Sequence, residues 1–97
     1  MNTVAFQKAA EAEGYKIDEP NSLSPNKHNA EHTQPFDAMV IVLEGEITIG
    51  CAGADTTYGP GDSCTMAAET PHTETVGSEG VTLLVARRGT RRASVST

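Results

Sequence analysis

The strongest indication of the fold is the stretch Met39-Val-Ile-Val-Leu-Glu-Gly-Glu-Ile-Thr-Ile49. Every position from residue 38 to residue 43 is apolar, as in a strand that is covered on both faces. Residues 46–49 alternate polar and apolar side chains, as in a strand with one buried face. Glu44 and Gly45 lie between these two parts and predict a tight turn that joins two strands.

The rest of the chain continues this β-rich pattern. Further strands are expected at residues 63–66, 72–76 and 81–86, separated by residues 67–71 and 77–80. Residues 50–55 read as a hairpin loop, and the Gly-Pro-Gly-Asp stretch at residues 59–62 predicts a type II turn. Short, regularly spaced strands of this kind predict an all-β barrel or double-sheet jelly roll.

The N-terminal part differs in character. Residues 3–13 predict a short amphipathic helix that Thr3 caps and Gly14 ends. Residues 16–30 are polar and contain two prolines, so they are expected to form a loop with an edge strand near residues 15–17.

Length and charge limit the classes of protein to which the chain can belong. Its 97 residues predict a single domain, assigned to residues 1–86, followed by a flexible basic tail at residues 87–97. Residues 1–86 carry three Lys and all 13 acidic residues, a net charge of −10, which disfavours nucleic acid as a partner. No apolar run is long enough for a membrane span and no signal peptide is visible, which predicts a cytoplasmic protein without a membrane partner. The two cysteines, Cys51 and Cys64, are interpreted as free thiols, with Cys64 as a candidate cavity-wall residue.

Two short segments, Glu31-His-Thr-Gln-Pro-Phe-Asp37 and Ala68-Glu-Thr-Pro-His72, carry candidate site residues. The chain resembles the cupin family, whose motifs read G-x5-H-x-H-x(3,4)-E-x6-G and G-x5-P-x-G-x2-H-x3-N. Aligned on Gly45, the family's two histidine positions fall on His32 and Gln34, and its glutamate position falls on Ala38. In the second motif Gly61 and His72 match, whereas the Pro, Gly and Asn positions hold other residues.

The resemblance covers about residues 26–86 and implies a cupin-type double-stranded β-helix, a jelly-roll barrel. It also implies a divalent metal ion (zinc, nickel, manganese or iron) held by His32, Gln34 and His72. His32 and Gln34 are two residues apart and therefore share one face of a strand. The alternative for each histidine is a buried neutral side chain that donates to a backbone carbonyl.

Asp37 is a candidate substitute for the missing carboxylate, but regular alternation would point it away from His32. A bulge at Pro35 would shift this alternation by one residue. The other interpretation of Asp37 is a hydrogen-bond acceptor that anchors a loop. Glu69 and Glu74 are interpreted as rim charges, so that no second ligand is expected on the strand of His72.

Two functions remain open at this point, because one fold serves many activities. The first is a divalent-metal-binding barrel that binds or acts on a small molecule, with or without catalysis. The alternative is a non-catalytic small-ligand binding or sensor barrel that has lost strong metal affinity. A homodimer is also expected, because a strand that is apolar on both faces and a short helix need cover.

Overall fold

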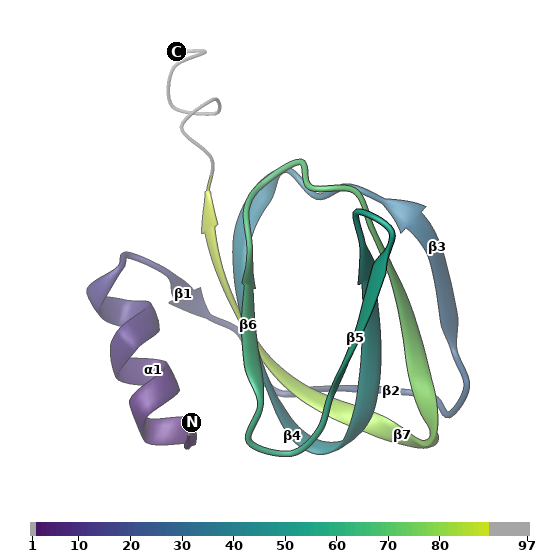
Figure 1. Ribbon diagram of the computed structural model, residues 1–97. Coiled ribbons are helices and arrows are strands. Elements are labelled where there is room, and N and C mark those ends of the chain that lie inside the picture. The colour runs from purple at the N-terminus through teal and green to yellow at the C-terminus, as the bar shows by residue number, and fades with distance from the viewer. Residues whose placement is uncertain (1, 90–97) are drawn as a thin grey trace.

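The structure, a computed structural model, describes residues 2–89, which form one short helix and seven strands (Figure 1). The elements are α1 (Thr3–Ala12), β1 (Lys16–Ile17), β2 (Asn21–Leu23), β3 (His28–His32), β4 (Phe36–Cys51), β5 (Ala54–Tyr58), β6 (Ser63–Met66) and β7 (His72–Gly89). The prediction of a mostly β chain with a short N-terminal helix is confirmed.

The two long strands, β4 and β7, form the frame of the sheet. They pair antiparallel along almost their whole length, from Phe36 opposite Gly89 to Gly50 opposite Thr73. The shorter strands β1, β2 and β3 add to β7, whereas β5 and β6 add to different parts of β4. Figure 1 shows that the sheet is strongly curved, although the pairs among residues 2–89 do not close it into a ring.

The predicted turn at Glu44-Gly45 was wrong, as was the predicted break at residues 77–80. Both lie inside continuous strands, and the β4–β7 register shifts between Val42 and Glu44 and again after Gly45. Gly45 and Gly80 have positive φ angles of 78° and 80°, and a Cβ atom on Gly45 would collide with the carbonyl of Gly80. The glycines therefore bend two paired strands together instead of reversing the chain, because positive φ serves a bulge as well as a turn.

Residues 38–43 of β4, which are apolar on both faces of the strand, are covered on both sides within the chain. One face packs in an interior cluster formed by Val42, Ile47, Val76, Val81 and Leu83. The other face packs against α1 in a second cluster formed by Phe6, Ala10, Met39, Ile41, Leu84 and Ala86. The helix thus covers an apolar face of β4 that a second copy of the chain was expected to cover. The homodimer stays a prediction.

The N-terminal part shows two further differences from the sequence-based expectation. Asn2, not Thr3, caps α1, because the Asn2 side-chain oxygen accepts a hydrogen bond of 2.8 Å from the Ala5 amide. The edge strand at Lys16–Ile17 is confirmed, but the expected loop at residues 16–30 also contains β2 and the start of β3. All side chains of β2 and β3 are exposed or half-buried, and their mostly polar sequences lack the apolar alternation that marks a strand.

The end of β7 corrects the predicted boundary of the basic tail. Arg87 and Arg88 belong to the strand, where Arg87 forms an ion pair of 2.7 Å with Asp18 and Arg88 one of 2.9 Å with Asp37. The remainder of the predicted tail, residues 90–97, lies outside the described residues. In the described part of the chain, α1 is far too short to cross a membrane.

Candidate metal centre

His32 and His72 lie side by side although they are far apart in sequence. His32 ends β3, His72 begins β7, and the antiparallel register of these strands makes the two residues direct partners. Their ring centroids are 4.3 Å apart, with the ring planes inclined at 53°. The structure therefore brings together the two histidines that the sequence pointed to.

Backbone carbonyls fix the orientation of both imidazole rings. Nδ1 of His32 lies 2.8 Å from the carbonyl oxygen of Ala30, and Nδ1 of His72 lies 2.9 Å from that of Thr70. A carbonyl oxygen can only accept, so each Nδ1 carries the hydrogen and donates it. In the neutral ring this leaves the lone pair on Nε2, which is the arrangement found in metal-ligating histidines.

Glu74 completes the group. It lies two residues after His72 on β7 and therefore on the same face of the strand. Its carboxylate oxygen Oε2 lies 3.4 Å from Nε2 of His72, while its Oε1 accepts a hydrogen bond of 2.7 Å from the side-chain nitrogen Nδ2 of Asn29. One nitrogen or oxygen ligand atom from each of His32, His72 and Glu74 lies within 4.8 Å of the others.

The contact between His72 and Glu74 brings two hydrogen-bond acceptors together when the histidine ring is neutral. The His72 side chain is only 2% exposed, and its Nε2 lone pair would face an oxygen lone pair of Glu74 if the ring were neutral. A proton on Nε2 or a shared cation would make this contact favourable. Two ligand atoms at about 2.1 Å from a tetrahedral ion are roughly 3.4 Å apart, which is the distance observed. The geometry suits a shared metal ion as well as a charged imidazolium–carboxylate pair.

The interpretation of Glu74 as a rim charge was wrong. The available signal was the spacing of His72 and Glu74, because a His-x-Glu segment on one strand presents both side chains to the same face. The expectation that the strand of His72 offers no second ligand fails for the same reason.

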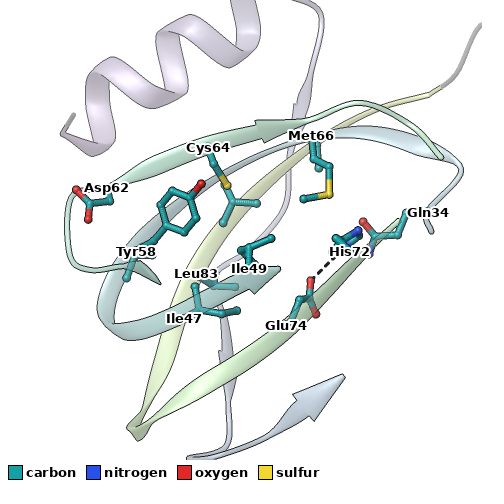
Figure 2. A pocket seen from close by; sticks show the side chains of 13 residues that line it. Gln34, Ile47, Ile49, Tyr58, Asp62, Cys64, Met66, His72, Glu74 and Leu83 are labelled. Carbon is teal, nitrogen blue, oxygen red and sulfur yellow. Dashed lines mark ion pairs between the residues drawn. The ribbon is translucent and has the colours of Figure 1, made fainter. Parts of the chain in front are cut away.

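Gln34 and Ala38, at the other two family positions, both line the same interior pocket as His72. Figure 2 shows the Gln34 side chain at the end of the pocket that His72 and Glu74 occupy. Ala38 is 6% exposed and offers no ligand atom, so the carboxylate nearest to the histidines comes from Glu74 instead. The assignment of His32, Gln34 and His72 as metal ligands stays a prediction.

The Asp37 carboxylate is held by a backbone amide and by Arg88, and its role as a substitute ligand stays a prediction. Its Oδ1 accepts a hydrogen bond of 2.8 Å from the amide of Ala68, and its Oδ2 accepts hydrogen bonds from Arg88 at 2.9 and 3.1 Å. Arg88 also donates to the carbonyl of Glu13 just after α1. These contacts support the loop-anchor interpretation, in which Asp37 holds the turn that precedes β7.

The pocket extends away from the histidines between apolar side chains. Its volume is about 50 Å³, and its apolar lining comes from β4, β6 and β7: Ala38, Val40, Val42, Ile47, Ile49, Met66 and Leu83. Tyr58 and Cys64 also line it, which agrees with the expected place of Cys64 in a cavity wall. Burial raises the pKa of both the Tyr58 hydroxyl and the Cys64 thiol.

A comparison of the sequence with protein families matches residues 20–86 to the cupin domain. The chain belongs to the cupin family. A comparison with curated proteins found no significant match to this chain.

Solved structures with the same fold include three informative cases. A cupin superfamily protein from Desulfitobacterium hafniense has 18% identity and a TM-score of 0.66, over 73% of this chain and 64% of that protein. A protein of unknown function from Rhizobium leguminosarum bv. viciae has 20% identity and a TM-score of 0.69, over 93% and 96% of the two chains. The DMSP lyase DddQ from Ruegeria pomeroyi has 22% identity and a TM-score of 0.65, over 72% of this chain and only 36% of the lyase. At these identities the similarity establishes the fold.

Proposed function

We propose that this cupin binds a divalent metal ion through His32, His72 and Glu74, inside a jelly-roll barrel that also binds a small organic molecule. The observation that carries the proposal is the orientation of the ring nitrogens. Both Nδ1 atoms donate to backbone carbonyls, and the remaining Nε2 of His72 faces a carboxylate oxygen at 3.4 Å.

The donor set fits a first-row metal ion. Two imidazoles and one carboxylate suit zinc, nickel, iron and manganese, and the amide oxygen of Gln34 is a candidate fourth donor. The charge of Glu74 replaces the carboxylate that the family pattern places at residue 38. Asn29 holds this carboxylate at 2.7 Å, as hydrogen-bonding partners of metal ligands commonly do. When bound, such an ion supplies Lewis-acid polarisation of an oxygen atom of the small molecule.

A specific observation favours the alternative, a ligand-binding or sensor barrel without strong metal affinity. Gln34 is a neutral and weaker donor than the family's histidine, and the contact between His72 and Glu74 is also satisfied by a proton. In that case the pair is a structural ion pair at the end of an apolar pocket.

Calorimetric titration of metal-free, tag-free protein with zinc, nickel and manganese separates the two functions. The proposal expects one ion per chain, no binding after His72→Ala, and binding at least tenfold weaker after Glu74→Gln. Glu79→Gln is the matched control, because Glu79 is an exposed glutamate on the same strand outside the metal group. Gln34→His should tighten binding, because imidazole is a better donor than an amide. Absence of binding by the wild type, or equal binding by wild type and Glu74→Gln, would overturn the proposal.

A further inference from the structure

The pocket has a second polar end, away from the histidines. Tyr58 on β5, Cys64 on β6 and Asp62 in the turn between them lie together there (Figure 2). The Tyr58 hydroxyl and the Cys64 thiol lie close enough for each to shift the pKa of the other. The Gly59 amide donates a hydrogen bond of 2.9 Å to Oδ2 of Asp62.

The side chains between the two ends are aliphatic, and none of the 13 side chains that line the pocket belongs to Lys or Arg. A negatively charged group of a ligand therefore finds no cationic side chain along the wall. Its favourable place is the metal end, where the ion supplies positive charge. A second anionic group would lie against Asp62 or against apolar side chains, which is unfavourable in a partly desolvated pocket.

The far end favours a hydrogen-bond donor. Burial raises the pKa of Tyr58 and of Cys64, so both side chains are uncharged near neutral pH. The Tyr58 oxygen and the Asp62 carboxylate are hydrogen-bond acceptors that line this end of the pocket, where Asp62 is solvent-exposed. An ammonium or a hydroxyl group matches these acceptors, whereas a methyl group leaves them without a ligand partner.

The size of the pocket limits the length of the ligand. A cavity of about 50 Å³ holds roughly three to five water molecules. Their combined liquid volume corresponds to an organic molecule of about six to eight non-hydrogen atoms.

We propose that the pocket binds a short aliphatic carboxylic acid with an amino or hydroxyl group at its far end. The carboxylate lies at the His72–Glu74 end and the donor group contacts Tyr58 and Asp62. This inference rests on the proposed metal site, because the ion is the positive partner of the carboxylate. The ligand chain lies along the aliphatic wall between the two ends.

Four probe molecules test this assignment by calorimetry on the zinc-loaded protein. 4-Aminobutanoate and 4-hydroxybutanoate carry the donor, and pentanoate replaces it with a methyl group of similar size. Succinate has a second carboxylate in place of the terminal carbon and its donor group. The affinities of 4-aminobutanoate and 4-hydroxybutanoate should be at least about tenfold higher than that of pentanoate. This is the difference expected from one hydrogen bond with a charged or buried partner. Succinate should bind more weakly than either.

Two variants test which side chains discriminate between the probe molecules. Tyr58→Phe should reduce the preference over pentanoate to about threefold or less while zinc affinity stays unchanged. Asp62→Asn, which retains an acceptor for the Gly59 amide, should weaken 4-aminobutanoate more than 4-hydroxybutanoate. The second variant thus separates recognition of an ammonium from recognition of a hydroxyl group.

The zinc titration of the same preparation distinguishes the two ways in which the proposals can fail. A protein that binds zinc but binds pentanoate or succinate as tightly as 4-aminobutanoate overturns this inference alone. Unchanged discrimination in both Tyr58→Phe and Asp62→Asn also overturns it. A protein that binds no zinc overturns the metal site and this inference together.

Discussion

Replacing Phe6 with alanine should remove the side chain that holds α1 against the sheet. Phe6 is 0% exposed and packs in the same cluster as Ile41 and Leu84, which are 1% and 4% exposed. Truncating a fully buried phenylalanine costs about 3–5 kcal/mol, because transfer and cavity terms add. A domain of this size loses about 4–8 °C in melting temperature per kcal/mol. We therefore expect the melting temperature to fall by roughly 12 °C or more.

Thermal unfolding followed by circular dichroism measures this change. The matched control is Val4→Ala on the same helix, because Val4 is 61% exposed and its truncation should alter stability by no more than about 0.5 kcal/mol. A melting temperature of Phe6→Ala close to that of the control would refute the packing of α1 on β4 and β7. Light scattering of the wild type in the same series tests the predicted homodimer, which a stable monomer at micromolar concentration would contradict.

Three other outcomes follow from contacts elsewhere in the sheet. Gly45→Ala should destabilise the chain strongly in denaturant unfolding, because the added Cβ meets the backbone of β7, whereas Gly89→Ala, with open space around it, should not. Asp37→Ala should lower the free energy of unfolding by about 1–3 kcal/mol, because the part-buried Ala68 amide loses its acceptor. The same variant should bind zinc more weakly. Unchanged values in both assays would contradict the anchor role of Asp37. Because burial raises the pKa of Cys64 above its ordinary 9.0, alkylation of this thiol, located by mass spectrometry, should still accelerate above pH 9; a plateau below that pH would contradict it.

The strands themselves could largely be predicted, because apolar alternation is a local property of the sequence. The continuity of β4 could not, since Gly45 permits both a reversing turn and a bend within a paired strand. β2 and most of β3 could not be predicted either. Their hydrogen bonds to β7 involve the backbone, and their mostly polar, solvent-accessible side chains do not reveal the pairing.

The candidate site was predictable at its two histidines and incomplete elsewhere. His32 and His72 stand at family positions, but that they are direct partners depends on the register between β3 and β7. Glu74 lies outside the family pattern and was interpreted as a rim charge, although its spacing from His72 places both side chains on the same face of β7. The role of Asp37 depends on its contact with Arg88, which is 51 residues away and cannot be read from local sequence.

Diffraction data collected at the zinc absorption edge, from crystals grown with zinc, test whether His32, His72 and Glu74 share one metal ion. One ion is expected, bound by Nε2 of both histidines and by a Glu74 oxygen at about 2.0–2.2 Å. Crystals with no ion between these side chains, and with Glu74 still in direct contact with His72, would contradict the shared site and identify the pair as a structural ion pair.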